Sequence, residues 1–230
     1  MDAATLERLN HYRTNRIPVA LVTELQSGIN TVFTDETSCD GDLGDAIASA
    51  LQSGKSGSVT VNDVPYFINA YRPQPRIVII GAVHISQALV PMAKLADFDV
   101  TIVDPRTAFA TQERFAKTDL IADWPEDVLQ TRVLDRHTAL VALTHDPKID
   151  DFPLAEALRS RCFYVGALGS RRSHAARLER LKNQGFDDDQ LSLIHGPIGL
   201  NIGAASPAEI AVAILAEVIG TMRSGSKRGG

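Results

Sequence analysis

The segment from Arg76 to Asp104 predicts a strand, a glycine turn, a helix and a second strand, in that order. The first apolar run ends at Gly81, and the second ends at Asp104. This is the plan of a dinucleotide-binding half-fold, whose three glycines make a tight turn, let a pyrophosphate approach the backbone and pack helix on strand. Gly81 fills the first position, but Val83 and Ser86 occupy the other two. The segment therefore predicts the fold and argues against ordinary NAD binding.

The chain after Asp104 continues to alternate between expected strands and helices. Apolar runs at 138–144 and 161–165 fit strands buried on both faces, and helices are expected at 153–159, 170–184 and 207–222. This alternation predicts an α/β fold, a Rossmann-like parallel sheet with helices on both faces. Residues 1–72 are expected to form a small α+β N-terminal domain, residues 73–222 the Rossmann-like domain, and residues 223–230 a disordered tail.

Composition limits the classes of function that are open to the chain. Of its 230 residues, 44% are hydrophobic and 22% charged, as in an ordinary soluble globular protein. No apolar run approaches the ~20 residues that span a bilayer, and no apolar signal core follows the N-terminus, so we expect a cytoplasmic protein without a membrane partner. A net charge of −5 argues against a nucleic-acid partner. The two cysteines, Cys39 and Cys162, lack metal-type spacing, and no metal site is expected.

Four polar or glycine-containing segments follow predicted strands. In open parallel sheets, ligands bind beyond the carboxyl ends of the strands, so these segments are expected at one edge. The candidate cofactor-binding residues in them are Gly81, His84, Asp104, Arg106, His145, Asp146, Gly166, Gly169, Ser170, Arg171 and Arg172.

The best candidate for an anion site is the segment Gly166–Arg172. Its glycines permit tight turns, a helix then begins with free N–H groups, and Arg171 or Arg172 could grip a phosphate. The alternative is a capped helix whose arginines are solvated. Asp104 has two interpretations as well, because it could accept hydrogen bonds from ribose hydroxyls or cap the following turn.

Other features leave their own alternatives. His145 and Asp146 could form an acid–base pair or part of a ligand set, although a histidine at the end of a strand is usually structural. The loop 196–204 mixes apolar residues with glycines and could pack rigidly over the sheet edge, before a helix N-terminus at Ser206 that is a second potential anion site. The aspartates at 187–189 suggest a solvated turn rather than a metal site.

Five segments together resemble the xanthine dehydrogenase accessory factor family of the XdhC/CoxI type. They are GAVHISQAL, the strand ending in VDPR, THDP, YVGALGSRRSHAARLERL and PIGLNIGAASPAEIAVAILAEVI. The resemblance runs from about Arg76 to Met222, and its last two segments are specific in order, spacing and content. In two places the chain departs from the family pattern: Val83 and Ser86 replace glycines, and Cys39 precedes the glycines that a cysteine usually follows.

The resemblance implies a maturation factor for molybdenum hydroxylases such as xanthine or CO dehydrogenase. Such a factor binds molybdenum cofactor (molybdopterin), protects it and assists its sulfuration and insertion. It would be a chaperone without catalytic residues, and its partners would be the apo molybdenum hydroxylase, a cysteine desulfurase and a second copy in a homodimer. The phosphate of the pterin would suit the loop at Gly166–Arg172.

Two other functions remain open at this point. An NAD(P)-dependent oxidoreductase of a small substrate is supported by Gly81 and Asp104 and opposed by Val83 and Ser86. It would also need a proton donor, for which His145 is the candidate. The third possibility is a scaffold that docks a partner and has lost its small ligand.

Overall fold

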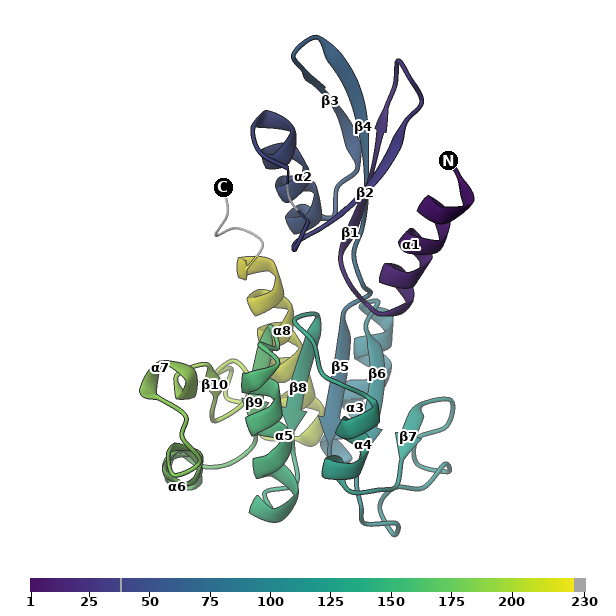
Figure 1. Ribbon diagram of the computed structural model, residues 1–230. Coiled ribbons are helices and arrows are strands. Elements are labelled where there is room, and N and C mark those ends of the chain that lie inside the picture. The colour runs from purple at the N-terminus through teal and green to yellow at the C-terminus, as the bar shows by residue number, and fades with distance from the viewer. Residues whose placement is uncertain (38, 226–230) are drawn as a thin grey trace. The chain divides into compact units, whose positions relative to one another are not determined.

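The computed structural model describes residues 1–37 and 39–225, which divide into two compact units (Figure 1). Unit 1 comprises Met1–Pro73, and unit 2 comprises Gln74–Gly225. Of the tail that was expected to be disordered, residues 223–225 are helical, and residues 226–230 lie outside the described residues. None of the described helices is long and apolar enough to cross a membrane.

Unit 1 is an antiparallel sheet of strand order β2-β1-β4-β3, with a helix on each face. Alternate residues of β1 face opposite helices: Ala20 and Val22 pack with Ile47 of α2, whereas Val19 packs with Leu9 of α1. The elements are α1 (Ala3–Thr14), β1 (Val19–Glu24), β2 (Asn30–Thr34), α2 (Asp42–Ser53), β3 (Gly57–Val61) and β4 (Val64–Tyr71).

Unit 2 contains a six-stranded sheet of order β10-β9-β8-β5-β6-β7, in which every neighbouring pair is parallel. The order reverses between β5 and β8, as in the Rossmann fold. The predicted Rossmann-like sheet is therefore confirmed. The elements are β5 (Arg76–Ile80), α3 (His84–Leu95), β6 (Asp99–Val103), β7 (Asp119–Ile121), α4 (Pro125–Thr131), β8 (Thr138–Ala142), α5 (Pro147–Arg159), β9 (Tyr164–Ala167), α6 (Arg171–Lys182), α7 (Asp188–Leu191), β10 (Ile194–His195) and α8 (Pro207–Gly225).

Helices cover both faces of this sheet, which explains why its central strands are apolar throughout. Ile77 and Ile79 of β5 pack on the face that carries α3 and α8, whereas Val78 and Ile80 pack on the face that carries α4 and α5. All five residues of β8 are buried. Strands of this kind give no polar alternation in the sequence, as expected for a parallel sheet between helix layers.

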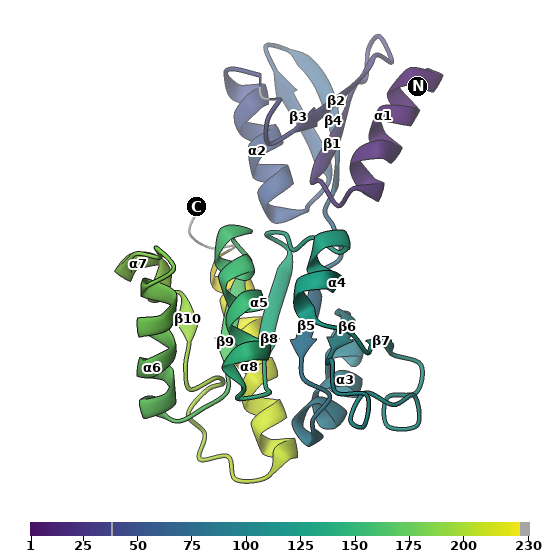
Figure 2. The same ribbon diagram turned by 60° about the horizontal axis from the view of Figure 1, so that its bottom comes forward.

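The N-termini of α3, α5, α6 and α8 follow the carboxyl edge of the sheet, which Figure 2 turns toward the viewer. Side chains cap three of these helices: Asp146 accepts the Lys148 N–H, Ser170 accepts the Ser173 N–H, and Glu209 accepts the Ser206 N–H. The capping box predicted at the start of α8 is thus present. The local sequence therefore fixes where the helices begin, and with them the edge that carries the candidate site.

Several elements differ from the sequence expectations; β9, for instance, begins at Tyr164 rather than at 161, and β7 was not expected. Helix α5 begins at Pro147 rather than Pro153, because Pro147 occupies the first helical turn and Asp146 caps it. Strand β10 was not expected, since its two residues are too short to give a periodic pattern.

Candidate functional site

The loops that follow β5 and β8 meet at the point where the strand order reverses. Gly81 has φ +117°, and a Cβ at this position would lie 3.0 Å from Thr144 Cγ2. The turn after β5 is therefore pressed against the turn after β8, and both belong to the edge where such sheets bind ligands. The structure therefore places Gly81 against Thr144, the residue before His145.

Ser86 stabilises this turn from the position where the fingerprint has its third glycine. Its side chain is fully buried, and its hydroxyl donates to the Gly81 carbonyl at 2.6 Å. Val83, at the second glycine position, is half-buried and packs against the core. Helix α3 therefore packs on the sheet without the two missing glycines.

Asp104 stabilises the site through hydrogen bonds within the protein. Its Oδ2 accepts the Ala82 N–H at 2.7 Å and Arg106 Nη2 at 2.8 Å, while its Oδ1 accepts the Arg106 N–H and Nε, both at 2.9 Å. Burial raises the pKa of Asp104, but these hydrogen bonds outweigh burial and hold the pKa below its ordinary value. A carboxylate has about four lone-pair positions, and protein donors fill all of them. This geometry favours the turn-capping alternative over ribose recognition.

Two arginines enclose the same turn. The guanidinium of Arg106, committed to Asp104, lies 4.8 Å from the ring centroid of Phe109. Arg114 donates to the carbonyls of Ala82 at 2.9 Å and Phe109 at 2.8 Å. The sequence did not single out Arg114, since no motif surrounds it. Its contacts leave the β5–β6 side of the site internally hydrogen-bonded.

Asp150 is a buried carboxylate beside the turn after β8, and sequence reasoning missed it. It is 1% exposed, and it accepts the Thr144 hydroxyl at 2.7 Å and the His145 N–H at 3.0 Å. Burial raises the pKa of Asp150 to about 6, against these hydrogen bonds and the charge of Arg177. Asp150 therefore shapes the turn that presents His145.

His145 and Asp146, predicted as a pair, have different surroundings. His145 is exposed at φ +63°, and desolvation of its ring and the charge of Arg177 lower its pKa. Asp146 caps α5 through Lys148 and is half-buried. The structure gives Asp146 a structural role and leaves His145 available at the edge.

The loop between β9 and α6 divides the predicted anion site into a buried and an exposed part. A Cβ at Gly166 would lie 2.6 Å from the Tyr164 hydroxyl, so this glycine serves packing inside the strand. Gly169, at φ +147°, is half-buried, and its absent Cβ would lie 2.5 Å from Ser173 Oγ. Ser170 caps α6. The segment therefore offers Gly169 and Ser170 to a ligand, but not Gly166.

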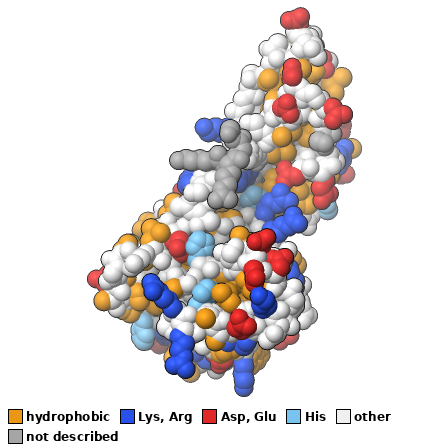
Figure 3. Space-filling view, turned by 90° about the vertical axis from the view of Figure 1, so that its left-hand side faces the viewer, with side chains coloured by type: hydrophobic (Ala, Val, Ile, Leu, Met, Phe, Trp, Pro, Cys, Tyr) orange, Lys and Arg blue, Asp and Glu red, His pale blue; other side chains and the backbone are white. Residues whose placement is uncertain are grey.

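Arg171 and Arg172, the arginines chosen from the sequence, begin α6 and are exposed. In Figure 3 the Lys and Arg side chains of unit 2 form separate patches on the visible face. That Arg171 and Arg172 contact a phosphate therefore remains a prediction. His84, at the first position of α3, is likewise exposed.

Arg177, not predicted from the sequence, lies beneath the Leu168–Ser170 loop. It is 4% exposed and donates through Nη2 to the Leu168 carbonyl at 3.0 Å. Its Nε and Nη1 are buried and have no hydrogen-bond partner within the described part of the chain. Burial lowers the pKa of Arg177. The nearby carboxylates of Asp150 and Asp151 partly offset this lowering.

A helical pattern in the sequence could have revealed Arg177. Leu181 is buried on α6, and one turn back along the same face stands Arg177. His174 lies a further turn back, and its Nδ1 is also buried without a hydrogen-bond partner among the described residues. The buried side of α6 is therefore polar at its N-terminal end and apolar at its C-terminal end.

The loop 196–204 is fixed to α8 through Glu217. Oε2 of Glu217 accepts the Tyr164 hydroxyl at 2.6 Å and the Gly199 N–H at 2.8 Å, and its Oε1 lies 3.2 Å from Nδ1 of His195. His195 also stacks on the Tyr164 ring at 4.6 Å between centroids. Ile198 is buried, but Leu200 and Ile202 are exposed, so only the first part of the loop packs as the sequence predicted.

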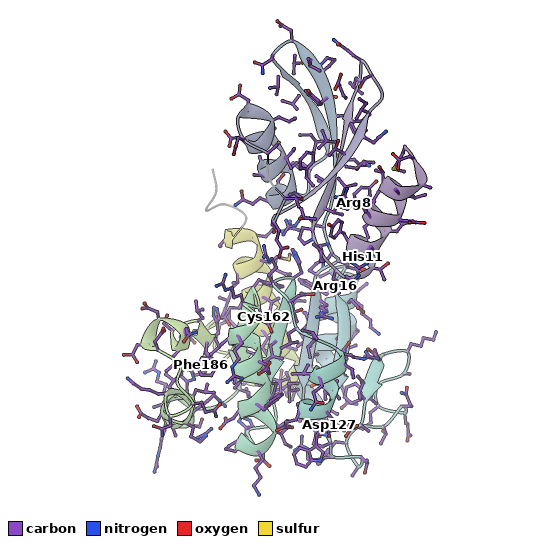
Figure 4. All side chains as sticks on the ribbon, viewed as in Figure 1. Arg8, His11, Arg16, Asp127, Cys162 and Phe186 are labelled. Atoms are coloured by element: carbon purple, nitrogen blue, oxygen red, sulfur yellow. The ribbon has the colours of Figure 1, made fainter. Side chains whose placement is uncertain are left out.

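Residues outside this edge serve packing. Cys162, labelled in Figure 4, precedes β9 and so lies at the amino edge of the sheet, and burial raises the pKa of its thiol to about 12. Phe186, also labelled there, lies between α6 and α7 under the guanidinium of Arg159. Asp187 caps α7, and no metal-binding group of three or more acidic, His or Cys side chains is found among the described residues.

Comparison with known protein families identifies the family to which unit 2 belongs. The model of the XdhC Rossmann domain matches residues 77–218. The chain belongs to this family. The match spans β5 to α8 and includes both halves of the candidate site, so the resemblance stated from sequence motifs is confirmed.

Three curated relatives are similar to the chain. A protein of Bacillus subtilis (strain 168), named as a probable xanthine dehydrogenase subunit, is 35% identical over 161 residues, which are 68% of this chain and 46% of the relative. The molybdenum cofactor insertion chaperone PaoD of Escherichia coli (strain K12) is 30% identical over 149 residues, 64% of this chain and 40% of PaoD. The uncharacterised protein YqeB of the same strain is 28% identical over 172 residues, 75% of this chain and 31% of YqeB.

The chain therefore spans less than half of each of these relatives. A solved structure from Bacillus halodurans, described as a xanthine dehydrogenase, matches 95% of this chain and 64% of that protein. Its TM-score is 0.65 at 24% identity, which shows a shared fold.

Proposed function

We propose that this chain binds molybdenum cofactor and acts as a maturation factor for a molybdenum hydroxylase. The observation that carries the proposal is the contrast between the two halves of the site. Asp104 occupies the β5 turn with four internal hydrogen bonds, whereas Arg177 beneath the β9–α6 loop keeps two buried donor groups without a partner among the described residues. Donors left unpaired in this way fit the phosphate of a pterin cofactor.

The relatives support the same function. One is named a molybdenum cofactor insertion chaperone, and another is named a probable xanthine dehydrogenase subunit. We infer that the chain receives the cofactor, assists its sulfuration and delivers it to the apo hydroxylase. The partners would be that apoenzyme, a cysteine desulfurase and a second copy of the chain in a homodimer.

The site residues then take different roles. Gly169, Ser170 and the N-terminus of α6 would hold the phosphate, with Arg171 and Arg172 adding charge from the exposed side. His145, exposed at the end of β8, would line the same edge. Gly81 and Arg106 would shape this edge through contacts within the protein.

The geometry argues against an NAD(P)-dependent oxidoreductase. The Ala82 N–H, which belongs to the turn that would approach a pyrophosphate, already donates to Asp104. Asp104 in turn has no lone pair left for ribose hydroxyls. The cysteine before β9 does not supply a nucleophile either, because the raised pKa of Cys162 keeps the thiol protonated at neutral pH.

The first experiment is a parallel titration of the purified chain with molybdenum cofactor, NAD(H) and NADP(H), followed by calorimetry. We expect a micromolar or lower dissociation constant for the cofactor and no dinucleotide binding. The double variant R171A/R172A should bind the cofactor more weakly, whereas R223A, at an exposed arginine in the last turn of α8, should not. Dinucleotide binding without cofactor binding would overturn the proposal.

The maturation step needs a separate test in cells that lack the chain. We expect the hydroxylase to accumulate as an inactive protein whose activity is restored by the wild-type gene and less by the double variant. Full activity of the hydroxylase without the chain would contradict the maturation role, whatever the chain binds.

A further inference from the structure

The β9–α6 loop of unit 2 covers an arginine whose hydrogen-bonding capacity is largely unused. A guanidinium carries five N–H donors, and Arg177 donates from Nη2 to the Leu168 carbonyl at 3.0 Å. Its Nε and Nη1 have no partner in the described part of the protein. Leaving buried donors of a charged group unpaired costs free energy. Such a group calls for a partner that the described residues do not provide.

The charged groups around Arg177 do not fill this gap. Asp151 is held by Arg180, whose Nε and Nη2 donate to its two oxygens. Asp150 is held by the Thr144 hydroxyl and the His145 N–H. Both carboxylates are near enough to influence the pKa of Arg177, but neither forms an ion pair with it. Nε and Nη1 are therefore buried donors without a partner among the described residues.

The covering loop brings its backbone close to the guanidinium, directly before the N-terminus of α6. Gly169 has no Cβ, and a Cβ at this position would lie 3.8 Å from Nη2 of Arg177. The glycine is required by its φ of +147° and by Ser173, whose Oγ would lie 2.5 Å from a Cβ, rather than by the guanidinium. The free N–H groups at the start of α6, a 12-residue helix, point toward the same loop. Two independent sources of positive charge thus meet at Gly169.

We propose that Arg177 and the Leu168–Ser170 loop form an anion site that binds a phosphate group. The guanidinium exchanges the Leu168 carbonyl for the phosphate, and the Nε and Nη1 donors gain the partner that they lack among the described residues. This inference rests on the proposed function only for the source of the phosphate, which would be the pterin phosphate of molybdenum cofactor. It shifts the principal contact from the exposed Arg171 and Arg172 to the buried Arg177.

The wild-type protein itself allows the decisive measurement. We would follow the Nε–Hε cross-peaks of its arginines by ¹⁵N NMR during titration with inorganic phosphate, with sodium chloride added to the same ionic strength as a control. R177K identifies the cross-peak of Arg177 by its loss. We expect this cross-peak to shift saturably with phosphate and not with chloride. A cross-peak of Arg177 that stays in place up to saturating phosphate would overturn the proposal.

Matched variants give a second readout. R177K keeps the charge but loses the fork that holds a phosphate, and we expect it to weaken phosphate binding about tenfold in calorimetry. R180K carries the same substitution one turn along α6, where Asp151 holds the side chain, and should leave phosphate affinity within about twofold. Equal affinities of wild type and R177K would count against the site.

The titration with cofactor separates this inference from the proposed function. If the cofactor moves the Arg177 cross-peak and competes with inorganic phosphate, both stand and the source is the pterin phosphate. If phosphate moves the cross-peak but the cofactor does not bind, the site stands as one for free phosphate and the proposed function fails. If the cofactor binds without moving this cross-peak, the proposed function stands and the Arg177 site fails.

Discussion

Replacing Asp104 by asparagine tests whether the β5–β6 half of the site is held by its internal hydrogen bonds. Asparagine keeps one acceptor oxygen, which can still serve the N–H and Nε of Arg106. Its amide NH₂ replaces the oxygen that accepts from Ala82 and from Nη2 of Arg106. The Ala82 N–H and Nη2 of Arg106 would then each face the N–H groups of the asparagine amide.

The magnitude follows from the burial of those two donors. Ala82 is fully buried, so its unsatisfied N–H costs about 1–3 kcal/mol. The side chain of Arg106 is 33% exposed, so Nη2 can turn toward water, and we expect its loss to add only about 1 kcal/mol. Together D104N should lower the free energy of unfolding of unit 2 by about 2–4 kcal/mol.

Urea unfolding can be measured for unit 2 alone. Trp124 is the chain's single tryptophan and lies in unit 2, so its fluorescence reports on this unit. The control is D189N, the same change at an exposed aspartate of α7, which should cost less than about 0.5 kcal/mol. The reasoning is wrong if D104N costs less than about 1 kcal/mol.

The same urea unfolding, measured at a series of pH values below neutrality, tests whether the charge of Asp104 stabilises unit 2. Its folded pKa lies below the ordinary value, so its contribution is present above about pH 4 and is lost as the pH falls through the folded pKa. D104N should flatten this loss. An unchanged loss of stability at acid pH would mean that the carboxylate contributes its packing and not its charge.

Three further predictions concern other buried groups. Because the folded pKa of Asp150 is raised to about 6, the native state binds its proton more tightly, and stability should fall by roughly 3 kcal/mol as the pH rises from about 3 to about 7; D150N should lack this fall in urea titrations. Gly199→Ala places a Cβ 3.1 Å from the α8 backbone at φ +91° and should lower Tm by several degrees more than Gly203→Ala, where nothing lies within 4 Å. Tyr164→Phe removes the 2.6 Å hydrogen bond to Glu217 and should cost about 1.5–3 kcal/mol in urea unfolding, whereas a cost near zero would show that Glu217 is satisfied without it.

The architecture of unit 2 could be predicted from the sequence because parallel strands between helix layers leave a strong local signal. The continuous apolar runs at 76–80 and 138–142 and the caps at Ser170 and Ser206 are all short-range patterns. Strand β10 has two residues, so its pairing with β9 depends on the surrounding structure and leaves no periodicity.

The candidate site was only partly predictable, since charge and glycine patterns do not show which polar group is buried. Helix α6 has five Lys or Arg residues. Sequence reasoning chose Arg171 and Arg172 because they adjoin the glycines, yet these two are exposed and Arg177 is buried. The sequence could not decide between the two interpretations of Asp104 for the same reason, since its four donors come from the folded turn and from its own neighbour Arg106.

These two outcomes together explain how the chain can keep a Rossmann sheet without its glycine fingerprint. A ligand gains free energy from polar groups that are still unpaired, because a group already satisfied within the protein must first lose its partner. The turn after β5 is satisfied through Asp104 and Ser86, so nothing needs to approach its backbone, and a side chain at Val83 obstructs no ligand. Among the described residues, unpaired donors lie instead beneath the loop after β9, at Arg177. On this reasoning, restoring glycine at Val83 should not create dinucleotide binding, because the Ala82 N–H would still donate to Asp104.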